Sequence, residues 1–198
     1  MSVSTRAGPP DGPSDAEIVR RVLVGDINAF ELLVNRYQAT CLRFATRMLG
    51  DSTDAEDAVQ TAFVRAYDAL GRYEDRARFS SWLFAIVVNE CRALRASASR
   101  RERFESAQAN HAVDQGENEV SMDPSHEFAG GDERLAKVER AVQTLEPLLR
   151  EAFLMRYVQE MDYAEMARAT GAGRSALKMR VKRACDALRT QLRGLSND

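Results

Sequence analysis

The sequence predicts an all-α protein with two small helical domains joined by a flexible acidic linker. Apolar residues recur at spacings of three and four along most of the chain, as on the buried face of a helix, and no strand-like alternation occurs. Charge is divided unevenly. Residues 15–100 hold 12 acidic and 12 basic side chains, residues 101–133 hold 9 and 2 (net −7), and residues 134–195 hold 7 and 13 (net +6). The middle segment lacks periodicity and contains Gly, Pro, Asn and Asp throughout, which is typical of a linker.

Length and composition favour soluble, core-forming units, because 44% of the 198 residues are hydrophobic and 29% are charged. Residues 1–14 are rich in Gly, Pro and Ser and carry no apolar run, so they predict a disordered tail and not a signal peptide. No segment reaches the length of a membrane span. We therefore expect a cytoplasmic protein without membrane insertion.

The cysteines and histidines do not form a metal-binding pattern. The three cysteines are an odd number, lie far apart and fit helical patterns, so we expect small core residues and no disulfide. His111 and His126 both lie in the linker without a further ligand at suitable spacing. No metal and no cofactor is expected. The cysteines are Cys41, Cys91 and Cys185.

The first domain is expected to begin with a short helix and a longer one. Ser14 and Glu17 form the S-x-x-E pattern of a capping box, and the short helix should end near Gly25. Asp26 is expected to cap the longer helix, and Gly50 to end it. The buried stripe of this helix comprises Phe30, Leu33, Tyr37, Cys41, Phe44 and Met48.

A third helix follows the capping residues 51–53. Its acidic first turn suits the positive end of the helix dipole, which is a purely structural role. Asp57 and Gln60 lie three apart on one polar face, so they are equally consistent with a docking surface. The inner face comprises Ala55, Val59, Ala62, Ala66 and Leu70, with Phe63 and Tyr67 beside it.

Residues 71–78 break the helical pattern and predict a loop before the fourth helix. Tyr73, Phe79 and Trp82 lie beside arginines here, which is typical of single-stranded DNA binding, because aromatic faces stack bases and guanidinium groups hold phosphates. The alternative is that Phe79 and Trp82 are core residues, and for these two residues taken alone it is the favoured interpretation. The loop and the arginines together favour the functional interpretation. The outer side of the helix carries Asn89, Arg92 and Arg95.

The second domain, residues 134–195, is expected to contain two helices separated near Pro147 and then a helix-turn-helix at about 163–182. Ala167, Gly171 and Leu177 supply a small residue, a turn glycine and an apolar anchor at offsets of four and six. The helix after the turn is basic and carries no acidic residue from Arg174 to Arg183. The alternative is an ordinary helical hairpin with a solvated basic face, but the one-sided charge favours DNA reading.

Three segments together resemble an extracytoplasmic-function (ECF) sigma factor of bacterial RNA polymerase: DAEDAVQTAFVRAY, FSSWLFAIVVNECRAL and LEPLLREAFLMRYVQEMDYAEMARATGAGRSALKMRVKRA. The resemblance covers both predicted domains, which would be sigma region 2 and sigma region 4. It implies a promoter-specificity subunit that is not an enzyme and has no small-molecule substrate. The implied partners are the clamp and flap of core RNA polymerase, promoter DNA and an anti-sigma factor.

The resemblance also assigns roles to particular residues. The segment Asp57–Leu70 would dock on the polymerase clamp, and Asn89 would hold a base flipped out of the minus-10 element. The implied polymerase contacts are Asp54, Glu56, Asp57, Gln60, Thr61, Phe63 and Val64. The implied minus-10 contacts are Tyr73, Phe79, Ser80, Trp82, Asn89, Arg92 and Arg95. The implied minus-35 contacts are Arg174, Ser175, Lys178, Met179, Arg180, Lys182 and Arg183.

The chain departs from the family pattern at three places. Thr61 replaces an acidic residue of the polymerase-binding motif, and the usual Leu-Pro pair has its proline displaced to Pro147. Residues 175–180 read SALKMR where the family has Gly-Thr-Val-Lys-Ser-Arg, so the promoter sequence cannot be carried over.

Two other functions fit the same sequence. A one-component DNA-binding regulator would use only residues 134–195, and polymerase binding by residues 15–100 distinguishes it from a sigma factor. A helical interaction protein would use the basic face for solubility only, and salt-dependent DNA affinity distinguishes that case.

Overall fold

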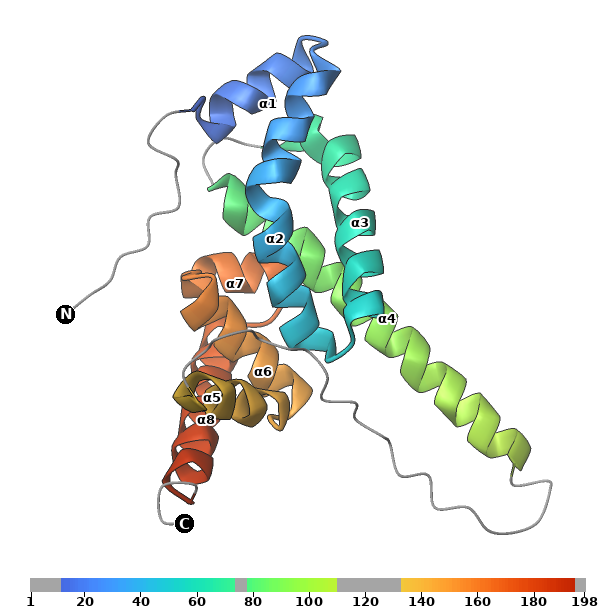
Figure 1. The fold of residues 1–198 in the computed structure, drawn as a ribbon, viewed down its shortest axis with the longest axis vertical. Helices are drawn as coiled ribbons and strands as arrows, with labels where there is room; N and C mark the ends of the chain where they lie inside the picture. The colour runs from blue at the N-terminus through green and yellow to red at the C-terminus, as the bar shows by residue number, and fades with distance from the viewer. Residues whose placement is uncertain (1–11, 74–77, 110–132, 195–198) are drawn as a thin grey trace.

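In a computed structural model of the chain, residues 12–73, 78–109 and 133–194 are described, and every regular element in them is helical. Two helical bundles pack against each other (Figure 1). The N-terminal bundle comprises α1 to α4, and the C-terminal bundle comprises α5 to α8. Buried apolar side chains of both bundles belong to one connected cluster. Most of residues 1–14 and 101–133, expected to be tail and linker, lie outside the described residues.

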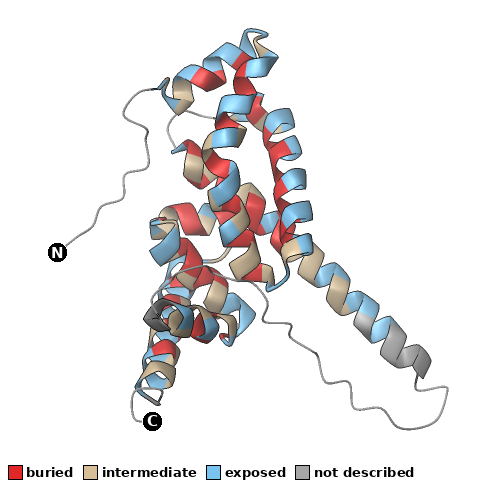
Figure 2. Cartoon of the chain, viewed as in Figure 1, coloured by how far each residue is buried: buried red, intermediate tan, exposed pale blue. Residues whose placement is uncertain are grey.

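The N-terminal bundle forms as its apolar pattern predicts, with the whole predicted stripe of α2 and the inner face of α3 buried (Figure 2). Ser14 and Glu17 make the expected capping box, and Gly50 takes a left-handed conformation (φ 82°) that ends α2. Asp51 caps α3 by accepting from the backbone N–H of Asp54. The elements are α1 (Asp15–Leu23), a 3-10 turn (Ile27–Ala29), α2 (Phe30–Leu49), α3 (Ser52–Ala69), a 3-10 turn (Leu70–Arg72) and α4 (Phe79–Ala109).

The C-terminal bundle carries the predicted pair of helices at its end. Pro147 occupies the first turn of α6, where its missing N–H has no helical partner to lose. The helix that follows changes to π-helical geometry at Leu154–Val158. The elements are α5 (Glu133–Gln143), α6 (Pro147–Phe153), the π-helical turn, α7 (Tyr163–Thr170) and α8 (Arg174–Gly194).

Three local expectations differ from the structure. Asp26 caps no helix and instead accepts two hydrogen bonds from Arg21, at 2.7 and 3.0 Å. Cys41 and Cys91 are core residues, but Cys185 is only half-buried, with its Sγ 3.6 Å from the hydroxyl of Tyr157. α4 continues to Ala109, past the expected linker start at residue 101, because no Gly or Pro interrupts this stretch. The end of α4 projects away from both bundles (Figure 1).

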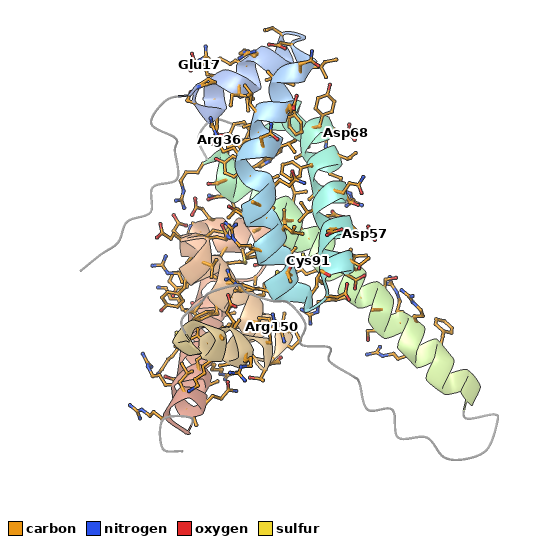
Figure 3. The ribbon with its side chains drawn as sticks, in the orientation of Figure 1. Glu17, Arg36, Asp57, Asp68, Cys91 and Arg150 are labelled. Atoms are coloured by element: carbon orange, nitrogen blue, oxygen red, sulfur yellow. The ribbon has the colours of Figure 1, made fainter. Side chains whose placement is uncertain are left out.

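The linker is not the only connection between the two bundles, contrary to expectation. α4 packs on α7, while α2 contacts α5 and α6. The guanidinium of Arg47 on α2 pairs with the carboxylate of Glu139 on α5 at 2.6 Å. The backbone carbonyl oxygen of Arg47 accepts a hydrogen bond from the side-chain amide of Gln143. Arg150 of α6 lies at this junction (Figure 3), where it donates to the carbonyl oxygen of Met48. Burial lowers the pKa of Arg150.

Candidate nucleic-acid interface

The helix-turn-helix is built by two capping devices. Asp162 accepts from the backbone N–H groups of Ala164 and Glu165, and the Glu165 carboxylate accepts in return from the N–H of Asp162. Gly171 then takes a left-handed conformation (φ 70°), which allows the chain to leave α7 and begin α8 three residues later. These caps set the angle between α7 and α8.

The face of α8 away from the core is the predicted reading face. Leu177, Val181, Ala184 and Leu188 are buried, so the opposite side is fixed toward the exterior. The cation of Lys178 lies 5.7 Å from the centre of the Tyr163 ring, and the guanidinium of Arg156 lies 5.4 Å from the same ring. Arg180 is half-buried, at the side of the helix. The exposed predicted contacts are Arg174, Ser175, Lys178, Met179, Lys182 and Arg183.

The three predicted aromatic residues form one cluster at the start of α4. The ring centres of Tyr73, Phe79 and Trp82 lie 5.3 to 5.5 Å from one another. Phe79 is 2% exposed and also contacts Tyr37, so it is a core residue, as the alternative interpretation expected. Tyr73 and Trp82 are half-buried. The cluster therefore has a buried base and two partly accessible rings.

The polar residues predicted along α4 have different environments. Asn89 is exposed, whereas Ser80 and Arg95 are half-buried. Arg92 is held by the C-terminal bundle: its Nε and Nη2 each donate to a carboxylate oxygen of Glu151 at 2.7 Å. Its Nη1 donates to the carbonyl oxygen of Thr170, the last residue of α7, at 3.1 Å. The structure thus leaves Asn89 accessible and engages Arg92.

The predicted polymerase-binding residues lie on α3. Asp57 points outward from this helix (Figure 3). Val64 is an apolar residue that is 58% exposed to solvent. Phe63 is 8% exposed, so it belongs to the core and supports the surface from below. The exposed members of the predicted set are Asp54, Glu56, Asp57, Gln60, Thr61 and Val64.

The sequence did not predict a third ionic contact between the bundles, which adds to Arg47–Glu139 and Arg92–Glu151. The Glu165 carboxylate accepts from Arg78 Nη2 at 2.8 Å and Nε at 3.2 Å, and from the hydroxyl of Ser81 at 2.7 Å. The contact of Glu151 with Arg92 was not predicted from the sequence either. The D-x-x-E pattern of Asp162 and Glu165 marks a capping box in the sequence. No sequence pattern indicates that the same carboxylate reaches α4.

The pKa of Glu165 reflects these contacts. Burial raises the pKa, but the hydrogen bonds from Arg78, the backbone N–H of Asp162 and Ser81 lower it more, so it lies below the usual 4.5. The hydrogen bond to Glu165 raises the pKa of Arg78. The pKa of Asp162 is lowered, first by the backbone N–H of Glu165. Glu165 and Arg78 are therefore both charged at neutral pH.

Within the described residues, no group of three or more His, Cys, Asp or Glu side chains is placed to hold a metal ion. His111 and His126 lie outside those residues. None of the helices that the structure describes is both long enough and apolar enough to cross a membrane.

Two family models match the chain in the order of the two bundles. Residues 33–101 match Sigma-70 region 2, and residues 135–188 match Sigma-70 region 4. We use region 2 and region 4 below for the N-terminal and C-terminal bundles. The matched segments contain α3, the first part of α4 and the helix-turn-helix.

Full-length relatives agree with this match. The chain is 31% identical to the RNA polymerase sigma-H factor of Pseudomonas aeruginosa over 183 residues, which cover 91% of this chain and 95% of the relative. It is 29% identical to the ECF RNA polymerase sigma-E factor of Escherichia coli K12 over 193 residues, which cover 92% and 96%.

Solved structures show the same fold. CnrH in complex with the cytosolic domain of CnrY gives a TM-score of 0.60 at 26% identity, covering 89% of this chain and 96% of that one. The sigma factor RpoE bound to the anti-sigma factor NepR, from Bartonella quintana, gives 0.62 at 23% identity, covering 83% and 96%, and supports the fold alone. The chain belongs to the ECF-type family of sigma-70 sigma factors, the non-catalytic subunits that bind core RNA polymerase and promoter DNA and direct promoter-specific initiation through regions 2 and 4.

Proposed function

We propose that α8 reads the minus-35 element, that α4 with its aromatic cluster opens the minus-10 element, and that α3 docks on the polymerase clamp. The observation that carries the proposal is the exposed basic face of α8, fixed by the buried Leu177 and Val181 on the opposite side. A helix that follows a tight turn and presents its first turns outward is suited to the major groove. Ser175 and Lys178 take the base-reading positions, while Arg183 lies toward phosphates.

The minus-10 function is assigned to residues on α4 and the loop before it. Asn89 is exposed and offers both donors and acceptors to a base edge. The partly accessible rings of Tyr73 and Trp82 supply stacking surface. Stacking and hydrogen bonding together offset the few kcal/mol that unpairing a base costs. Phe79 has a supporting role because its ring is buried.

Docking on core polymerase is assigned to the outer face of α3. Asp57 and Gln60 are exposed one turn apart, and Val64 continues the same face four residues later. An exposed apolar residue beside polar ones is typical of the core of a protein interface. Thr61 places a hydroxyl where the family has an acidic group, so the exposed face of α3 carries one negative charge fewer than is usual in the family.

We further propose that a protein inhibitor binds this chain in the bacterial cytoplasm, where transcription takes place. Support comes from CnrH, whose solved structure contains the cytosolic domain of CnrY and aligns with 89% of this chain.

Run-off transcription with purified core polymerase and genomic promoter fragments tests the proposed function. We expect start sites on a small set of fragments. Asn89→Ala should reduce transcript yield or shift the preference among these fragments, and Lys178→Ala should reduce the selectivity. Asp186→Asn, which alters an exposed residue on the far part of α8, should behave as the parent does. DNA binding without polymerase binding would instead support a one-component regulator.

A further inference from the structure

One apolar side chain lies at the centre of the reading face of α8. Met179 is 48% exposed and belongs to the second turn of this helix, which begins at Arg174. At about 3.6 residues per turn, Met179 lies roughly 170° around the helix from the middle of the buried stripe that includes Leu177 and Val181. It therefore lies farther from the buried side than Lys178, which is roughly 90° from the same stripe.

The fold does not require an apolar residue at this position. Met179 does not belong to the apolar core cluster that the described residues form, so its substitution should leave stability nearly unchanged. Its surroundings distinguish it from other exposed apolar residues. The exposed polar side chains next to it on the helix surface are those of Ser175, Lys178, Lys182 and Arg183. Water and phosphates can satisfy these polar groups, whereas an apolar side chain needs an apolar partner.

The major groove of DNA offers one methyl group to such a side chain. Each base pair presents hydrogen-bond donors and acceptors there, and thymine alone adds an apolar group, its C5 methyl. The thioether of methionine is unbranched and adaptable, so it can pack on a methyl group without a fixed approach geometry. A basic helix with an apolar centre therefore matches a major groove that contains thymine.

The neighbours of Met179 extend this match along the helix axis. Ser175 lies one turn before it and Lys182 one turn after it, and both are exposed. A serine hydroxyl can bond to more than one base, so Ser175 supports base contact without strong selection. One helical turn advances about 5.4 Å, which is less than two base-pair steps of roughly 3.4 Å each. The bases nearest to Ser175 and Met179 should thus lie within about two base pairs of each other.

We propose that Met179 reads the C5 methyl group of a thymine in the minus-35 element and makes thymine the preferred base at one position. This inference rests on the proposed function of α8 and goes beyond it by naming the base and the group that is read. Arg183 supplies affinity that does not depend on sequence, because it holds phosphates. Met179 supplies discrimination, since another base at that position offers no methyl group.

The test removes the methyl group from the DNA and nothing else. Holoenzyme with the parent chain first selects its minus-35 sequence from a promoter library randomised in that element. Each thymine of the selected element, on either strand, is then replaced in turn by deoxyuridine, which lacks the methyl group and keeps every hydrogen-bonding group. Deoxyuridine should weaken binding about fourfold at one position, the factor expected for one methyl group buried from water, and should have little effect elsewhere.

Variants of the protein identify the residue that reads the methyl group. With Met179→Ser, thymine and deoxyuridine at the sensitive position should bind equally well, because the apolar partner is absent. Met179→Leu keeps an apolar side chain of similar size and should remain sensitive to deoxyuridine. The matched control is Leu148→Ser, which replaces an apolar residue of α6 that is 41% exposed and should behave as the parent does.

Three results would overturn the proposal. One is that no thymine of the element is sensitive to deoxyuridine in the parent holoenzyme. Another is a sensitivity that Met179→Ser leaves intact, because a different residue would then read the methyl group. The third is that Met179→Ser lowers the affinity for core polymerase and leaves DNA selectivity unchanged, which would make Met179 a protein contact.

Failure of the proposed function gives a different result. If the library selection yields no preferred minus-35 sequence, α8 does not read this element, and the proposed function and this inference fail together. A preferred sequence without sensitivity to deoxyuridine supports the proposed function and overturns only the role of Met179. The deoxyuridine comparison with the parent chain needs no variant, so it decides the question even if Met179→Ser folds poorly.

Discussion

Lys178 lies over the ring of Tyr163, so the first helix of the helix-turn-helix positions a predicted base-reading side chain of the second. Arg156 lies over the same ring and adds positive charge beside Lys178. The ammonium group of Lys178 therefore already has a defined position on the reading face before DNA binds.

This contact leads to a prediction for minus-35 specificity. Lys178→Ala should reduce discrimination among minus-35 sequences by about 1 to 3 kcal/mol if Lys178 reads a base. Tyr163→Leu should have a smaller effect, about 0.5 to 1 kcal/mol, because it removes only the cation–π contact. Tyr163→Phe keeps the ring and serves as the control. Binding of holoenzyme to a minus-35 sequence library measures all three. Identical profiles for Lys178→Ala and the parent would refute the assignment.

Arg183 should act on phosphates without regard to sequence. It is exposed, and it lies more than two helical turns beyond the start of α8. Arg183→Ala should weaken binding to all sequences alike and reduce the slope of log affinity against log salt by about one unit. A salt titration with two unrelated minus-35 sequences tests this. A sequence-dependent loss would reassign Arg183 to base reading.

Asn89 should act in promoter opening alone. Asn89→Ala leaves the buried face of α4 intact, so closed-complex formation and polymerase binding should be unchanged. Open-complex formation should slow, or preference at one minus-10 position should change, because a flipped base loses its hydrogen-bonding partner. Permanganate reactivity of unpaired thymines measures opening. Unchanged reactivity together with unchanged preference would exclude this role.

The α3 residues separate into surface and core. Asp57→Ala with Gln60→Ala should lower the affinity for core polymerase without changing thermal stability, because both side chains are exposed. Phe63→Ala should instead destabilise region 2 by about 3 to 5 kcal/mol, as expected for a large buried aromatic residue. Calorimetry and a polymerase pull-down distinguish the two effects. A thermal shift in the double variant would show that α3 was damaged instead.

The contact between Glu165 and Arg78 should depend on pH in a known direction. Because the pKa of Glu165 is lowered in the folded protein, its contribution to stability is fully present above the unfolded pKa of about 4.5 and is lost as pH falls through the lower folded pKa. Thermal stability of the parent should therefore fall more steeply below pH 4.5 than that of Glu165→Gln. Glu146→Gln, at an exposed site, should follow the parent. Parallel curves for parent and Glu165→Gln would contradict this assignment.

The sequence predicted the helices well because their buried faces are periodic. Every residue of the predicted stripe from Phe30 to Met48 is buried, and Gly50 and Gly171 end their helices in left-handed conformations, as their positions indicate. Such signals are local, since the side chains that determine them lie within a few turns. The helix-turn-helix was predictable for the same reason.

The remaining features depend on contacts between distant segments. Phe79 is buried because Tyr37 of α2 packs against it, and that neighbour is 42 residues earlier. Glu151 resembles any surface glutamate in the sequence until α4 brings Arg92 to it. Periodicity distinguishes inside from outside on one helix. It does not indicate which outside surfaces of two bundles meet.

The ion pairs Arg92–Glu151 and Arg78–Glu165 also bear on how sigma factors of this kind recombine. Arg92 belongs to the region 2 segment and Glu151 to the region 4 segment, so neither half of the chain carries a complete pair. A chimera that joined this region 2 to the region 4 of a relative would retain promoter-reading surfaces on both halves. Unless the incoming half supplied carboxylates at the positions of Glu151 and Glu165, the hybrid would lack these ion pairs between the bundles. Exchange of promoter specificity by gene fusion is therefore coupled, in this protein, to a change in the contacts by which the two bundles pack against each other.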